Sequence, residues 1–173
     1  MRLQNLTTVP DDEIRRIIAA VRPNGIANFS IRVTYNSGYG CSGRYYERRN
    51  HVILRIPRWE KRHVAQPRPG KGYLHGYAIG SIAEGIVMVM AHELRHAWQA
   101  VHRRGYRVWG SRGVYSERDA DAYGLQQLRR YRRGEIAPLS VPRVQPKVKK
   151  VEAVQVGEGV KARIEQLCQS TPT

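Results

Sequence analysis

The first half of the chain contains a helical hydrophobic pattern followed by an alternating one. Between Pro10 and Arg22 the aliphatic residues at helical spacing are Ile14, Ile17, Ile18 and Val21. Pro10 and the acids that follow it suit the first turn of a helix, and Pro23-Asn24-Gly25 ends it. From Phe29 to Tyr35 apolar and polar residues alternate, which predicts a half-buried strand. We expect the helix to cover one face of the sheet.

Two further strands are predicted before Pro57. One lies around Arg44 to Tyr46 and the other runs from His51 to Ile56, and the short turns between the strands predict an antiparallel meander. Residues 58 to 77 are rich in Pro, Gly and basic side chains, which predicts a long irregular loop. Loops of this length in compact domains are often functional.

A long buried helix is predicted from Ser81 to Gly105. Ser81 and Glu84 have the spacing of a capping box, in which the side chains of both residues bind backbone N–H groups at the helix start. The residues from Ile86 to Ala91 are apolar on every side of the helix. A helix without a polar face belongs in a core.

The second half continues with a third helix and a tail of different composition. Ser116 is expected to cap a helix from Glu117 to Arg133. The tail is rich in Pro, Val and Lys, which predicts a linker or arm with one short helix near its end. We therefore predict one α+β domain over residues 1–136, with a small antiparallel-rich sheet, and a basic C-terminal arm over residues 137–173.

Composition limits the location and the partners of the protein. No run of 18 or more apolar residues occurs and the N-terminus lacks the apolar core of a signal peptide, so we expect a cytoplasmic protein without membrane contact. The two cysteines, Cys41 and Cys168, cannot form a disulfide framework or a thiolate zinc cluster.

The net charge is +16, from 30 Lys and Arg against 14 Asp and Glu. A solvated basic surface explains this excess, and association with nucleic acid or an acidic partner is the alternative.

The buried helix carries the pattern His-Glu-x-x-His at His92, Glu93 and His96. Residues four apart lie on the same side of a helix, so the two imidazoles can bind one metal ion. Glu93 lies beside them, where it can take a proton from a water that the metal activates. These residues predict the site of a zinc-dependent peptidase, because the buried helix argues against a chance pattern on the surface.

His102 is one candidate for a third metal ligand. Its spacing from His92 matches the extended metzincin pattern, which needs a glycine where this chain has Gln99. If the helix continues, His102 lies about 15 Å further along the axis than His92. No methionine follows Met90, so a metzincin Met-turn cannot form. We expect His102 to lie at the exposed end of the helix.

Glu117 is the better candidate for the third ligand. Glu117 and Asp121 are four residues apart and share one face of the third helix. Glu117 would complete the ligand set, and Asp121 would accept a hydrogen bond from a ligand imidazole. The alternative is that Glu117 and Asp119 only stabilise the helix dipole, but this leaves Asp121 unexplained.

The two motifs together, His92 to His96 followed by Glu117 to Asp121, resemble those of gluzincin-type zinc metallopeptidases, in particular the small ImmA/IrrE-like peptidases. The resemblance implies a zincin-like fold in which the sheet packs on an N-terminal helix and two zinc-motif helices. It also implies one catalytic Zn²⁺ and a protein or peptide substrate, often a regulator. SprT-like proteases use a later histidine, and none follows His102.

The function predicted from these residues is hydrolysis of peptide bonds by a zinc metalloendopeptidase. Zinc would be bound by His92, His96 and Glu117, with Glu93 as the general base. The candidate donors to the oxyanion are Tyr106, Tyr115 and His75. The strand from His51 to Ile56 is the candidate edge for an extended substrate. The alternative function is a non-proteolytic, zinc-containing basic module that binds nucleic acid or an acidic partner.

Overall fold

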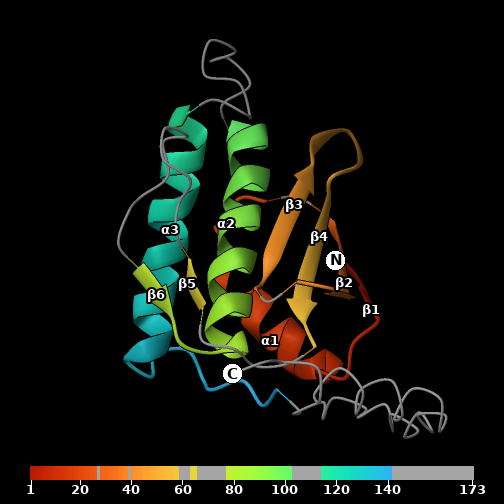
Figure 1. Ribbon diagram of the computed structural model, residues 1–173. Coiled ribbons are helices and arrows are strands. Elements are labelled where there is room, and N and C mark those ends of the chain that lie inside the picture. The colour runs from red at the N-terminus through yellow and green to blue at the C-terminus, as the bar shows by residue number, and fades with distance from the viewer. Residues whose placement is uncertain (27, 39, 59–62, 66–76, 103–113, 142–173) are drawn as a thin grey trace, which may run out of the picture.

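The computed structural model describes residues 1–26, 28–38, 40–58, 63–65, 77–102 and 114–141. In this part of the chain a four-stranded sheet lies beside three α-helices, and α2 lies between the sheet and α3 (Figure 1). The elements are β1 (Arg2–Asn5), α1 (Asp11–Val21), β2 (Ser30–Asn36), β3 (Ser42–Tyr46), the 3₁₀ helix η1 (Glu47–Arg49), β4 (His51–Pro57), β5 (His63–Ala65), β6 (Tyr77–Ile79), α2 (Ile82–His102) and α3 (Val114–Arg132). The predicted α+β class is confirmed. None of the described helices is both long and apolar enough to span a membrane.

The strand order of the main sheet is β1-β2-β4-β3. The predicted antiparallel meander is wrong, because β1, β2 and β4 run parallel and only β3 is antiparallel to its neighbour. The chain leaves β2, forms β3 at the edge, and returns through η1 to insert β4 between them. The strand β4 is the more apolar of the two, with Val52, Leu54 and Ile56 all buried, which favours the inner position.

Two further predictions are also corrected, one for a strand and one for a loop. The strand from His51 to Ile56 has β2 on one side and β3 on the other, so it is not an edge that could accept a substrate. The predicted loop from residue 58 to 77 contains β5, which pairs with β6 in a separate two-stranded sheet. Other parts of that loop lie outside the described residues.

The core lies between one face of the sheet and the helices α1 and α2. The sheet contributes Ile31, Val33 and the apolar face of β4, and each of these side chains is at most 1% exposed. The helical prediction for α1 is confirmed, with its four aliphatic residues buried against this face. Leu139, which follows α3, is also buried, and Arg16 of α1 donates hydrogen bonds to the carbonyl oxygens of Ala137 and Pro138. The rest of the predicted arm, 142–173, lies outside the described residues.

The N-terminus of α2 is capped as the sequence predicts, with one difference. The backbone N–H of Glu84 donates to Oγ of Ser81 over 3.1 Å, while the Glu84 carboxylate accepts from Gly80 over 2.7 Å instead of from Ser81. Arg132, at the end of α3, binds both carboxylate oxygens of Glu84 at 2.9 and 2.7 Å. This pair joins the start of α2 to the end of α3.

We expect Glu84→Gln to lower the free energy of unfolding by about 1 kcal/mol at pH 7. The hydrogen bonds from Arg132 lower the pKa of Glu84, and the Gly80 N–H adds to this against the opposing effect of burial. The stabilisation is therefore present above the unfolded-state pKa of about 4.3 and is lost as the pH falls through the lower folded-state pKa. Chemical denaturation at pH 7 and pH 3 checks this. A difference from wild type that is equal at both pH values would contradict it.

Candidate metal centre

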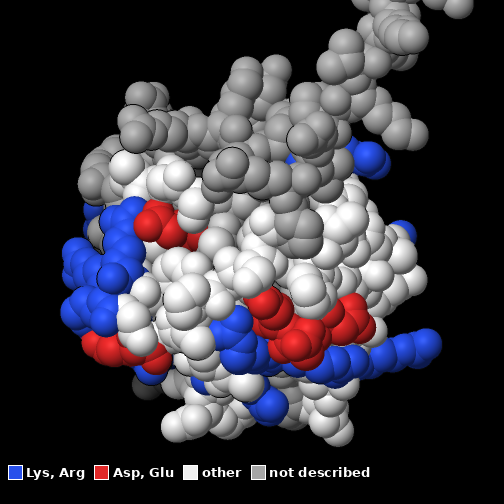
Figure 2. Space-filling model, turned by 90° about the horizontal axis from the view of Figure 1, so that it is seen from below, with Lys and Arg blue, Asp and Glu red and all other residues white. Residues whose placement is uncertain are grey.

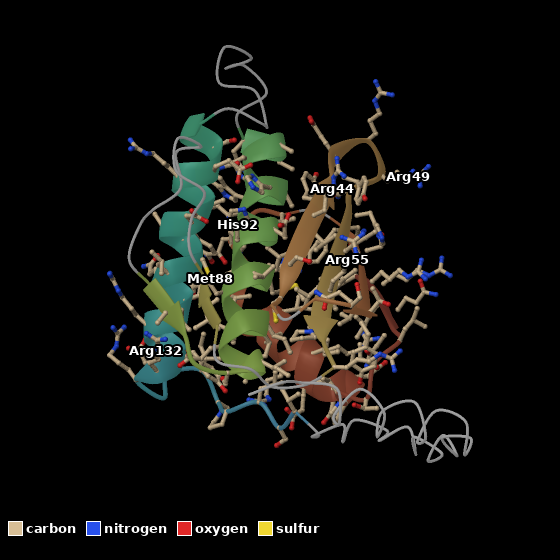
Figure 3. All side chains as sticks on the ribbon, viewed as in Figure 1. Arg44, Arg49, Arg55, Met88, His92 and Arg132 are labelled. Atoms are coloured by element: carbon tan, nitrogen blue, oxygen red, sulfur yellow. The ribbon has the colours of Figure 1, made fainter. Side chains whose placement is uncertain are left out.

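Three predicted ligands meet between α2 and α3. His92 and His96 come from α2, and their Nε2 atoms are 3.0 Å apart. Oε2 of Glu117, from α3, lies 3.4 Å from Nε2 of His92 and 3.5 Å from Nε2 of His96. His92 lies on the side of α2 that faces α3 (Figure 3). The two helices thus bring together the three side chains that were predicted from the sequence to form one ligand set.

The dimensions of this triangle fit a tetrahedral metal ion. Zinc bonds to nitrogen and oxygen of about 2.0–2.1 Å place neighbouring ligand atoms about 3.3 Å apart. The sides of 3.0, 3.4 and 3.5 Å in the structure bracket that value. Two imidazoles and one carboxylate suit zinc and related transition metals, whereas calcium and magnesium prefer oxygen ligands alone. The group could therefore hold a metal ion and would leave a fourth position open.

The orientation of His92 is set by Asp121, one turn after Glu117 on α3. Nδ1 of His92 lies 2.9 Å from Oδ1 of Asp121, and Asp121 is only 2% exposed. A carboxylate accepts a hydrogen bond, so Nδ1 donates its proton to Asp121, and Nε2 is the nitrogen whose lone pair a metal ion would take when it displaces the second proton. The predicted contact between Asp121 and a ligand imidazole is thus present in the structure.

The orientation of His96 is set by Gln99, a contact that sequence reasoning missed. The Gln99 amide nitrogen donates to the Ser116 carbonyl at 2.9 Å and to Oδ2 of Asp119 at 2.7 Å. Its oxygen therefore accepts from Nδ1 of His96 at 2.9 Å, which leaves Nε2 free for a metal. Arg95 in turn binds both oxygens of Asp119. The available signal was the three-residue spacing between His96 and Gln99, which places them on one helix face.

The start of α3 differs from the prediction in a way that supports this network. The helix begins at Val114, so Ser116 lies within it and is not its N-cap. Ser116 is 2% exposed, and its carbonyl is the one that accepts from Gln99. The burial of Ser116 and this hydrogen bond place this residue of α3 against α2.

Gly124 allows α2 and α3 to approach closely beside the site. A Cβ atom at this position would lie 3.0 Å from the backbone oxygen of Met88 and 3.6 Å from Cβ of His92. Met88 and His92 lie one turn apart on α2 (Figure 3). A side chain at Gly124 would push α3 outward and separate Glu117 from the two histidines.

Glu93 is buried against the edge strand of the sheet. It is 6% exposed, and its carboxylate accepts a hydrogen bond from the backbone of Tyr45 on β3. A Cβ atom at Gly43 of β3 would come within 2.4 Å of Cγ of Glu93. Glycine at this position therefore makes room for Glu93, and this is a second functional feature that the sequence pattern did not reveal.

The electrostatics of the site favour a bound cation. Burial opposes protonation of His92, but its hydrogen bonds with Asp121 and Glu117 and the charge of Glu93 outweigh burial and raise its pKa to about 10. Burial raises the pKa of Glu117, but its hydrogen bonds with His92 and His96 bring it below the ordinary value. Three carboxylates thus surround two imidazoles. A divalent ion would replace protons in this environment, because metal binding requires deprotonated ligands.

The pKa of Glu93 is shifted in the opposite direction from that of Glu117. Burial raises it above the ordinary value, and the charges of His92 and His96 offset this shift in part. A carboxylate with a raised pKa is a stronger base and is closer to the range in which proton transfer at neutral pH is efficient.

The remaining predicted residues do not belong to the group within the described part of the chain. His102 lies at the end of α2, where its ring stacks on Trp98 at 4.5 Å and Nδ1 contacts the Trp98 carbonyl at 2.9 Å. This agrees with the expectation that His102 is not a ligand. Tyr106 and His75 lie outside the described residues, as does the side chain of Tyr115, so the predicted oxyanion donors stay predictions.

The site therefore consists of three side chains that could hold a metal ion, two groups that orient the histidines, and a buried glutamate beside them. No protein-family model, no curated protein and no solved structure matches this chain.

Proposed function

We propose that the protein is a zinc-dependent metallopeptidase with a gluzincin-type ligand set and a zincin-like packing of its motif helices. The observation that supports this most is the triangle formed by His92, His96 and Glu117, with sides of 3.0 to 3.5 Å. A structural zinc site has four protein ligands, whereas a catalytic site has three and an open position. The described residues provide three.

Each residue has a defined task in this proposal. Zn²⁺, when bound, supplies the Lewis acid that polarises the scissile carbonyl and lowers the pKa of the attacking water. Glu93 accepts the proton of that water and transfers it to the nitrogen of the leaving amine. Asp121 and Gln99 hold the two histidines in the tautomer that presents Nε2 to the metal.

A protein or peptide substrate would bind along β3. This strand lies at the end of the sheet order, and its residues Gly43 and Tyr45 contact Glu93. An extended peptide that pairs with the side of β3 facing away from β4 would pass next to the general base. The edge strand in this proposal is therefore β3, in place of the strand that the sequence suggested.

The alternative function is a zinc-containing basic module that acts without proteolysis. It would carry the same metal and the same fold, and the net charge of +16 would serve an acidic partner. The two functions differ in one respect, which is metal-dependent cleavage.

Removal of the metal tests the peptidase proposal. We expect the zinc-loaded protein to cleave members of a diverse peptide library, as read by mass spectrometry of the new termini. Treatment with a zinc chelator should lower the rate more than about 100-fold, since both water activation and carbonyl polarisation are lost. Addition of stoichiometric zinc should restore the rate. Cleavage that survives complete removal of zinc would contradict the proposal, and so would the absence of any cleavage by the fully loaded protein.

A further inference from the structure

The face of the sheet that points away from α1 and α2 is strongly basic. The alternation that buries Ile31, Val33 and Leu54 on the inner face puts every second residue of each strand on the opposite side. We call this side the outer face and define it by the residues Arg2, Gln4, Ser30, Arg32, Thr34, Ser42, Arg44, Tyr46, His51, Ile53 and Arg55. It contains four arginines and no acidic residue.

The arginines of the outer face are arranged as a group across the strands. Arg32 and Arg44 lie on either side of Ile53 in one row of the sheet, and Arg55 lies in the next row. Neighbouring strands are about 4.8 Å apart and alternate residues of a strand about 6.7 Å apart. Arg49 of η1 extends the basic surface beyond the strands, and Arg44, Arg49 and Arg55 lie on the sheet side of the molecule (Figure 3).

The outer-face arginines form no ion pair with the carboxylates that the structure describes. Among the described residues no ion pair joins Arg2, Arg32, Arg44 or Arg55 to an acid. Four arginines of α2, α3 and the residue after α3 differ in this respect, since Arg95, Arg130, Arg132 and Arg133 each bind a carboxylate. Figure 2 shows the same mixed character on the lower face, where acidic and basic side chains lie side by side.

The pKa of His51 is lowered in part by the positive charges around it on the outer face. Its pKa lies below the ordinary value because of burial first, and then because of the charges of Arg32 and Arg49. The Ser30 side chain is within hydrogen-bond distance of Nδ1 of His51, at 2.8 Å. No described carboxylate contributes to this shift. A surface with an unbalanced positive potential attracts an anionic partner.

The side chains on the outer face favour nucleic acid among anionic partners. All of its cations are arginines, whose planar guanidinium groups bind phosphate in a bidentate manner and stack on bases. Arg44 lies over the ring of Tyr46 at 5.3 Å, and the rings of Tyr46 and His51 are 6.3 Å apart. Aromatic rings beside cationic groups are typical of surfaces on which unpaired bases stack.

The shape of the surface favours a single strand over a duplex. The DNA major groove admits a helix or a two-stranded ribbon, and the outer face is four strands wide. The C-terminal segment 142–173 is a poor occupant of this face, because its sequence contains six Lys and Arg against three Glu. Because this segment and the outer face are both positively charged, we expect the partner of the face to be another molecule.

We propose that the outer face binds single-stranded nucleic acid, with Arg32, Arg44 and Arg55 on the phosphates and Tyr46 and His51 under the bases. This inference does not depend on the peptidase proposal, because the outer face and the metal ligands lie on separate elements. In the sequence the excess of Lys and Arg is spread over the whole chain, whereas the structure gathers four of the arginines on one face of the sheet.

The test measures binding of the full-length protein to a fluorescein-labelled single-stranded oligonucleotide by fluorescence anisotropy. We expect Arg32→Gln/Arg44→Gln/Arg55→Gln to weaken binding roughly tenfold or more and to lower the slope of log K against log salt by about 2, because each phosphate contact contributes about 0.7. Tyr46→Ala should weaken binding about fivefold or more through lost stacking. The matched control, Arg15→Gln/Arg129→Gln/Arg133→Gln, removes the same charge from exposed helical and loop positions and should change binding less than threefold.

Circular dichroism and thermal unfolding establish that each variant is folded. The single variant Arg44→Glu, at an exposed position of β3, repeats the test if the triple variant is unstable. Equal losses in the triple variant and its control would overturn the proposal, and so would no measurable binding by the wild type. Tighter binding to a duplex, a poly-glutamate peptide or vesicles with anionic lipid, weakened by the same variants, would also overturn it and assign the face to that partner.

Discussion

Glu93→Gln is expected to abolish peptide hydrolysis while the fold and the metal content stay unchanged. Glutamine has nearly the same shape as glutamate and can still accept the hydrogen bond from Tyr45, so the buried space beside Gly43 remains filled. It cannot accept a proton. General-base catalysis contributes typically 10²–10⁴-fold, so we expect kcat to fall by about that factor. The measurement is the turnover of a cleaved peptide beside the zinc content of the same preparation.

The control for Glu93→Gln is Glu135→Gln, which makes the same chemical change at an exposed position after α3. It should leave turnover and zinc content at the wild-type level. Full activity of Glu93→Gln would show that Glu93 is not the general base. Loss of zinc from Glu93→Gln would instead show that Glu93 is a ligand, which the present assignment excludes.

Glu117→Ala is expected to weaken zinc binding by more than about 100-fold. Loss of a group that only orients a ligand typically costs 10–100-fold in metal affinity, and removal of a ligand costs more. The two histidines alone would remain, and their Nε2 atoms, 3.0 Å apart, would bind zinc as a bidentate pair. Competition with a chromophoric chelator measures the dissociation constant. Gly124 and the other contacts between α2 and α3 are unchanged, so the variant should stay folded.

His102→Ala is the matched control for the ligand assignment. His102 lies on the same helix but contacts Trp98 and not the metal group. We expect its zinc affinity to equal that of the wild type within about threefold. The opposite result, with zinc lost from His102→Ala and retained by Glu117→Ala, would show that the third ligand has been assigned wrongly.

The sequence predicted which three side chains come together because the geometry within each helix is local. His92 and His96 are four residues apart on one helix, and Glu117 and Asp121 are four apart on another, so helix geometry alone aligns each pair. Only one long-range contact, that of α2 with α3, had to be assumed to bring the pairs together. The apolar positions of α1 and the cap of α2 were predicted for the same reason.

Features that depend on contacts between distant segments could not be predicted in this way. Alternation identified β4 as a strand, but its position between β2 and β3 depends on which strands pair across the sheet. The role of Gln99 depends on Ser116 and Asp119, which lie on another helix. The space that Gly43 leaves for Glu93 likewise depends on the packing of β3 against α2.

We propose that His92, His96 and Glu117 bind one metal ion between α2 and α3. Metal analysis of the purified protein, combined with X-ray absorption at the zinc edge, tests it most directly. We predict one zinc per chain, with two imidazole nitrogens and a carboxylate oxygen at about 2.0–2.2 Å and no sulfur ligand. A folded protein that takes up no stoichiometric zinc would contradict the claim, as would zinc that remains fully bound in His92→Ala/His96→Ala.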